Sequence, residues 1–144
     1  MRVLVDTNIL LRRAQPNHEH HLAAAKTVAR LLANGDTLYF TPQNISEFWN
    51  ALTRPVVNNG LGFSVSQAVA EVEKVEDTLT LLPDSPATYD EWKRLVIKHS
   101  VMGSKVHDTR LVAAMNVHGV KQLLTFNAGD FLRFDIEVLH PTAV

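Results

Sequence analysis

The 144-residue sequence contains no cysteine. Disulfide bonds and thiolate metal sites are therefore excluded, and this composition is typical of a protein of the reducing cytosol. No apolar run approaches the roughly 20 residues needed to span a bilayer, and the apolar run at residues 3–5 is too short for a signal peptide. We therefore expect a cytoplasmic protein that makes no use of a membrane.

The sequence also lacks an excess of charge of either sign. Its formal net charge is −1 and its pI is about 6.6, so no overall basic field indicates nucleic-acid binding and any contact with a polyanion must come from a local patch. Apolar residues make up 46% and charged residues 20%, which is an ordinary globular composition. No repeat, low-complexity tract or linker interrupts it, and we predict a single domain over residues 1–144.

A buried strand and a carboxylate open the chain. The apolar, β-branched run Val3–Val5 predicts a strand that is buried on both faces, and Asp6 follows it directly. A buried carboxylate needs a partner or a metal, and ligands bind at the carboxyl ends of strands in open α/β sheets. Alternatively, Asp6 caps the following helix through the N–H group of Asn8 or Ile9. These residues alone leave both interpretations open.

Strand-like and helix-like segments alternate along the chain. We expect strands over residues 3–5, 37–41, 79–82, 120–126 and 136–139, and helices over residues 9–13, 22–34, 42–54, 65–79, 86–98 and 107–118. This alternation predicts right-handed crossovers and a mostly parallel sheet that helices cover on both sides.

Four polar sites follow the ends of predicted strands. Besides Asp6, they are Glu47 in the first turns of the helix that follows the second strand, Asp108 near the start of the last helix, and the pair Asn127 and Asp130 after residues 120–126. Each has a simpler explanation as a solvated, dipole-stabilising or turn residue. Taken together, converging carboxylates repel one another unless Mg²⁺ or Mn²⁺ binds between them. Such a site hydrolyses phosphodiesters, which makes a nucleic-acid backbone the expected substrate.

Four segments in this order resemble motifs of the PIN-domain ribonucleases, which include the VapC-type toxins of bacterial toxin–antitoxin pairs. They are Val5–Leu10 (VDTNIL), Ile45–Phe48 (ISEF), Asp108–Ala114 (DTRLVAA) and Leu124–Phe131 (LTFNAGDF). The resemblance covers essentially the whole chain. It implies a three-layer α/β/α fold around a parallel sheet and Mg²⁺- or Mn²⁺-dependent endoribonuclease activity.

The resemblance also assigns roles to the acidic residues. It makes Asp6, Glu47 and Asp108 the acidic triad, with Asp6 and Asp108 as direct metal ligands. Some family members carry an acid where this chain has Asn127, so either Asp130 supplies the fourth charge or Asn127 coordinates through its carbonyl oxygen or a water. With one negative charge fewer at this place, a one-metal mechanism is favoured over a two-metal one.

Neighbouring polar residues are candidates for contacts with the carboxylates or the substrate. Thr7 and Thr125 are expected to hydrogen-bond a carboxylate or phosphate, and Asn8 to anchor the loop beneath Asp6. Lys105 and Arg110 are candidate contacts for backbone phosphates. Their alternative roles are ordinary ones: caps and turns for the threonines, and solvated charges for the basic residues.

Several apolar positions indicate packing rather than substrate contact. Tyr89 and Trp92 are predicted on the inward face of their helix, and we expect Trp92 and Trp49 to be core or interface residues instead of base-stacking platforms. The region Val56–Leu79 is the most apolar outside the sheet, which suggests a homodimer or a groove for an antitoxin helix.

Two other classes of function remain. A PIN-like domain that binds RNA or a protein without cutting it would explain the missing acid at Asn127. A phosphatase also places an aspartate after its first strand, but Asn8 stands where the common phosphatase pattern has a second aspartate. Cleavage of mixed RNAs with Mg²⁺ and turnover of a phosphate monoester separate these hypotheses.

Overall fold

A five-stranded sheet forms the centre of the molecule in the computed structural model, which describes residues 1–144. The strand order is β3-β2-β1-β4-β5, and every pairing between neighbours is parallel. The strands are β1 (Arg2–Val5), β2 (Thr37–Phe40), β3 (Thr80–Leu81), β4 (Gln122–Leu124) and β5 (Glu137–Leu139). The predicted parallel sheet is therefore confirmed.

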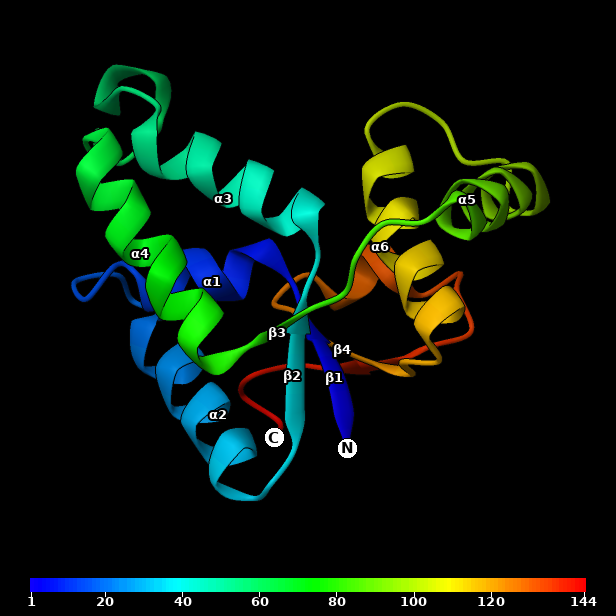
Figure 1. Cartoon of the computed structure of the whole chain (residues 1–144), viewed down its shortest axis with the longest axis horizontal. Coiled ribbons are helices and arrows are strands. Elements are labelled where there is room, and N and C mark those ends of the chain that lie inside the picture. The colour runs from blue at the N-terminus through cyan, green and yellow to red at the C-terminus, as the bar shows by residue number, and fades with distance from the viewer.

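Six α-helices cover the two faces of this sheet. They are α1 (Thr7–Arg13), α2 (His21–Ala33), α3 (Pro42–Thr53), α4 (Val65–Thr78), α5 (Pro86–Lys98) and α6 (Lys105–His118). Helices α1 to α4 lie on one side and α5 and α6 on the other, which confirms the three-layer α/β/α arrangement (Figure 1). None of these helices is both long and apolar enough to cross a membrane.

The central strand β1 divides the hydrophobic core into two parts. Val3 and Val5 pack into one cluster with residues of α1 to α4, whereas Leu4 packs into the other with residues of α5 and α6. All three side chains are fully buried, as expected for a strand between two helical layers. This burial on both faces fixes the position of Asp6 at the end of the strand.

Some element boundaries differ from the sequence-based prediction. The last helix begins at Lys105 instead of residue 107, and the strand predicted over residues 120–126 is limited to β4. Val120 lies just beyond the C-cap Gly119 and does not join the strand, because its N–H donates to the carbonyl of Met115 in the last turn of α6. Tyr89 was predicted to point inward, but it is 60% exposed. The helical period places Tyr89 beside the cavity between α5 and α6 rather than over the sheet.

Candidate active site

Asp6 lies at the carboxyl end of β1, where its side chain begins helix α1. Its Oδ1 accepts a hydrogen bond from the backbone N–H of Thr7 at 2.7 Å, so the side chain does cap the helix, although through Thr7 rather than Asn8 or Ile9. Its Oδ2 accepts from Thr125 Oγ1 at 2.8 Å. Asp6 is only 8% exposed, so capping and a place in a buried polar site occur together.

The loop after β4 is tied to the start of α1 by Asn8. Its Nδ2 donates to Thr125 Oγ1 at 3.2 Å, and its Oδ1 accepts from the N–H of Phe126 at 3.3 Å. The N–H of Asn127 donates to the same Thr125 oxygen at 3.0 Å. Thr125 therefore accepts from two donors and directs its own proton at Asp6. In the structure, Asn8 anchors this loop and Thr125 orients the carboxylate.

Burial makes the Asp6 carboxylate hard to ionise. Its pKa is raised from 3.8 to about 6, chiefly by removal from water; the negative charges of Asp108 and Glu47 add to the increase, and the hydrogen bonds from Thr125 and Thr7 act in the opposite direction. At neutral pH this carboxylate is therefore ionised in surroundings that favour its neutral form. Perturbed groups of this kind cluster at functional sites.

A buried asparagine in α3 positions the second acidic residue. Asn44 is completely buried, and its Nδ2 donates to Thr7 Oγ1 at 3.1 Å. The same Thr7 hydroxyl donates to Glu47 Oε1 at 3.1 Å. At its other end Asn44 completes a capping box, because its Oδ1 accepts from the N–H of Thr41 at 2.8 Å. Asn44 thus connects the cap of α3 to both Thr7 and Glu47.

The sequence-based prediction did not include Asn44. The signal that could have found it is the spacing Thr41-x-x-Asn44 directly after a strand, where a capping box brings the third residue of the helix back toward the sheet.

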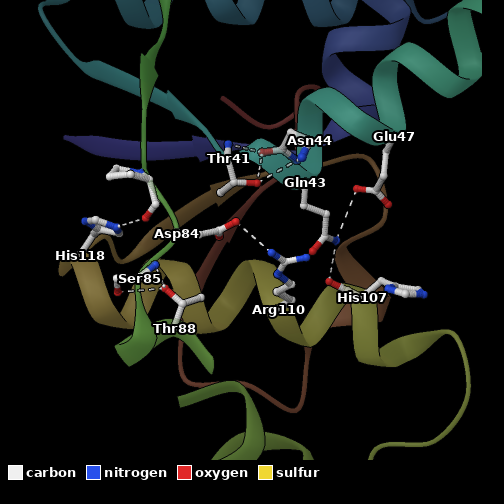
Figure 2. Close-up of polar contacts among 11 residues, drawn as sticks. Thr41, Gln43, Asn44, Glu47, Asp84, Ser85, Thr88, His107, Arg110 and His118 are labelled. Carbon is white, nitrogen blue, oxygen red and sulfur yellow. Dashed lines mark hydrogen bonds and ion pairs between the residues drawn. The ribbon is translucent and has the colours of Figure 1, made fainter. Parts of the chain in front are cut away.

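Gln43 connects α3 to α6 across the site, and the sequence-based prediction also missed this residue. Its Nε2 donates to the backbone carbonyl of His107 at 2.9 Å and lies 3.5 Å from Glu47 Oε1 (Figure 2). Its own Oε1 is buried without a hydrogen-bond donor. Because His107 precedes Asp108, this contact holds the first turn of α6 beside Glu47.

Asp108 is half-buried in the first turn of α6. Burial raises its pKa, and the negative charges of Asp130 and Glu47 raise it further, whereas the positive charge of Lys105 lowers it. Asp6, Glu47 and Asp108 therefore lie near enough to act on one another electrostatically, although they come from three different elements. They do not form a compact ligand group, since no three Asp, Glu or His side chains of the structure are gathered closely enough to hold a metal ion unaided.

The remaining predicted residues lie around these acids in different ways. Asp130 forms an ion pair with Lys105 at 2.6 Å, and both side chains are partly exposed. Asn127 is exposed, and it contributes its backbone N–H to the site. Arg110 pairs with Asp84 at 2.9 Å on the other side of His107, and it makes no hydrogen bond to the three acids.

The fold and the site define an α/β protein that carries acidic residues at the carboxyl edge of a parallel sheet. The model of the PIN domain matches residues 3–137 of the sequence. The chain therefore belongs to the PIN-domain family.

Solved structures with this fold include several bacterial VapC and VapBC proteins. The chain is similar to one in VapBC2 from Rickettsia felis bound to a promoter DNA fragment (TM-score 0.71, 13% identity, 97% of this chain and 98% of that chain). It is similar to VapC20 from Mycobacterium tuberculosis, a toxin that cleaves the sarcin–ricin loop (0.69, 17%, 94% and 98%). It is also similar to a chain in VapBC-1 from Haemophilus influenzae (0.68, 16%, 99% and 99%). No curated protein sequence matches the chain significantly.

Proposed function

We propose that this protein is an endoribonuclease that depends on Mg²⁺ or Mn²⁺ and hydrolyses phosphodiester bonds of RNA. The observation that carries the proposal is the convergence of Asp6, Asp108 and Glu47 at one edge of the sheet, where burial and the neighbouring negative charges raise the pKa values of Asp6 and Asp108. Bringing such carboxylates together costs free energy in the metal-free protein, and a hard divalent cation relieves that cost. The membership of the PIN-domain family supports the same reaction class.

The donor set fits such a cation. An ionised carboxylate offers about four lone-pair sites. Asp6 uses three of them at most, for Thr7, Thr125 and a long 3.5 Å contact with Asn8. Magnesium is usually held by one or two carboxylates together with water and substrate phosphates, so a compact group of three protein ligands is not required.

Asp6 and Asp108 would hold the cation, which would polarise the phosphodiester and supply an acidified water. Glu47 would hold or deprotonate this attacking water, because Thr7 already orients its Oε1 and the side chain is exposed at the rim of the site. Lys105 would bind a phosphate oxygen of the RNA strand, with Asp130 positioning its ammonium group.

The direct test is a cleavage assay on mixed single-stranded RNAs with Mg²⁺, with Mn²⁺ and with EDTA. We expect cleavage with either metal and none with EDTA, and we expect Asp108→Asn to lower the rate at least about a hundredfold, as for other groups that stabilise charge in a transition state. Asp77→Asn is the matched control, since Asp77 is an exposed aspartate in the last turn of α4, outside the acidic site and without a hydrogen-bond partner.

Equal cleavage in EDTA would contradict the metal requirement. RNA binding without cleavage under any of these conditions would instead favour the alternative of a non-catalytic PIN-like binding domain, for which the amide at Asn127 is the specific observation.

A second prediction concerns the ion pair of Lys105 and Asp130. If Asp130 acts by positioning Lys105, then Lys105→Gln and Asp130→Asn should each lower kcat/KM about tenfold, and the double variant should be no worse than either single one. If Asp130 were itself a metal ligand, Asp130→Asn would instead raise the Mg²⁺ concentration needed for half-maximal rate, and its effect would add to that of Lys105→Gln. A Mg²⁺ titration of all four proteins distinguishes these results.

We propose that this chain is the toxin of a toxin–antitoxin pair and that its protein partner is an antitoxin. We also propose that the chain forms a homodimer. Solved structures with this fold include FitAB bound to a DNA fragment and VapBC from Salmonella typhimurium bound to DNA, which supports a partner chain for this protein. The turn between α3 and α4 exposes Val56 and Val57, and α4 exposes Val65 and Val69. This apolar surface is the place we propose for contact with a partner chain.

A further inference from the structure

A cavity of about 350 Å³ lies between α5 and α6 beside the acidic site, and none of the three acids lines it. Its wall is formed by side chains of the loop before α5, of α5 itself and of the first turns of α6. The residues that matter for its chemistry are Asp84, Thr88, Tyr89, Trp92, His107 and Arg110. The volume lies in the range of about 300–1,000 Å³ that is typical of sites for small organic groups.

One wall of the cavity is aromatic. The rings of Tyr89 and Trp92 have centroids 6.2 Å apart and are tilted by 32°. Trp92 is held in place because its Nε1 donates to the carbonyl of Val106 at 2.9 Å, and Tyr89 is 60% exposed. Trp92 packs against the hydrophobic core as predicted, and its ring also lines the cavity. An immobilised ring beside an exposed one offers a flat apolar surface on which a nucleobase can stack.

The opposite edge of the cavity presents a carboxylate next to a guanidinium. Arg110 donates from one amino group to Asp84 Oδ2 at 2.9 Å, and the side chains are 47% and 41% exposed. Oδ1 of Asp84 accepts no hydrogen bond from the chain, and Arg110 retains other N–H donors. Figure 2 shows the two side chains meeting between the loop before α5 and helix α6.

This arrangement of acceptor and donor matches guanine among the four bases. Guanine presents two adjacent donors, N1–H and the N2 amino group, beside the acceptor O6. A carboxylate can accept from both donors while an arginine donates to O6 or N7, which is the usual arginine contact with guanine. Adenine, cytosine and uracil each place at most one donor beside their ring acceptors, so a carboxylate facing them gains only one hydrogen bond.

The cavity also adjoins the acidic site, through His107. His107 lines it and directly precedes Asp108, and its carbonyl group accepts from Gln43, which lies beside Glu47. We propose that this cavity binds a guanine base of the RNA next to the scissile phosphate, and thereby gives the enzyme a preference for cutting beside guanosine. This inference rests on the proposed ribonuclease function and names the specificity of the same site.

The test uses nucleotide binding without metal, so that it does not depend on cleavage. The full chain labelled with ¹⁵N has two indole N–H resonances, one from Trp92 at the cavity and one from Trp49 in α3 as an internal control. It is titrated with GMP, AMP, CMP and UMP in EDTA. We expect GMP to shift the Trp92 resonance with an affinity at least about fivefold tighter than the other three, and to leave Trp49 unmoved.

Two variants and one control complete the experiment. Asp84→Asn should abolish the preference for GMP over AMP, and Tyr89→Ala should weaken all four nucleotides. Glu91→Gln, which removes a comparable ion pair to Arg94 in the same helix outside the cavity, should change neither.

Equal affinity for GMP and AMP, or a preference that survives Asp84→Asn, would overturn the inference. So would a Trp92 shift that follows protein concentration without nucleotide, since a second copy of the chain would then occupy the cavity. GMP selectivity in a protein that fails to cleave RNA would refute the ribonuclease proposal and leave the guanine site standing. Cleavage of RNA without GMP selectivity would refute the guanine site and leave the ribonuclease proposal standing.

Discussion

Replacing Asp6 with asparagine is expected to abolish RNA cleavage and, in EDTA at pH 7.5, to leave the fold at least as stable as the parent protein. The loss of activity, at least about a hundredfold, follows from the removal of the most buried charge of the acidic site. The effect on stability follows from the same charge. In the metal-free protein, Asp6 must be ionised at this pH inside a nearly dry environment.

The sign of the pH dependence follows from the direction of the pKa change. The pKa of Asp6 is raised from 3.8 to about 6 on folding, so the folded state binds more protons than the unfolded state between these values. Stability is therefore greatest below about pH 4 with respect to this group, and it is lost as pH rises through about 6. The full loss corresponds to about 3 kcal/mol.

Asparagine avoids this ionisation and preserves the cap, since its oxygen can still accept from the N–H of Thr7. The substitution removes the hydrogen bond from Thr125, which lowers the free energy of unfolding by about 1 kcal/mol. Urea unfolding of both proteins in EDTA at pH 5 and pH 7.5 measures the balance. The parent should lose stability between the two pH values by more than the variant does. A variant that melts well below the parent at pH 7.5 would show that Asp6 is a structural residue.

Replacing Asn44 with alanine is expected to reduce the free energy of unfolding by about 2–4 kcal/mol, since it leaves three groups without their partner inside the protein, the hydroxyl of Thr41 among them. The N–H of Thr41 loses its acceptor, and the hydroxyl of Thr7 loses the donor that orients it. Thr7 is also the donor to Glu47, so this carboxylate should become less well positioned. We therefore expect a lower kcat in addition to the lower stability.

The matched control for this substitution is Asn50→Ala. Asn50 belongs to the same helix, is exposed, and makes no side-chain hydrogen bond, so the change removes the same atoms without removing a buried contact. Chemical denaturation and steady-state RNA cleavage below the unfolding transition measure the two effects separately. Equal stability of the two variants would show that the network around Asn44 contributes nothing, whatever its geometry.

The fold could be predicted from the sequence because its signals are local. The run Val3–Val5 indicates a strand between two layers, and Thr41-Pro42 and Ser64-x-x-Gln67 indicate helix starts that the structure confirms. The strand predicted over residues 120–126 is too long at both ends, since Val120 and Phe126 favour a strand by composition and only tertiary contacts decide which residues pair.

The sequence predicts the acids and the supports that adjoin them, Thr7, Asn8 and Thr125, but not the supports Asn44 and Gln43 in α3. Asp6 and Asp108 stand out because a carboxylate beside apolar residues has few explanations. Asn44 and Gln43 have polar side chains that are common at any helix start, and the contacts by which they join α3 to α1 and α6 are made to residues more than 30 positions away. Arg110 was expected near phosphates, but the sequence could not show that Asp84, from a loop 26 residues earlier, pairs with it.

The side chain of Gln43 joins two helices that belong to opposite layers of the sandwich. Glu47 is carried by the layer of α1 to α4 and Asp108 by the layer of α5 and α6, while Asp6 ends the strand between them. Neither helical layer can therefore bring the three acids together by itself. The RNA substrate that we propose would contact both layers at once, and its binding would hold α3 and α6 in a fixed relative position.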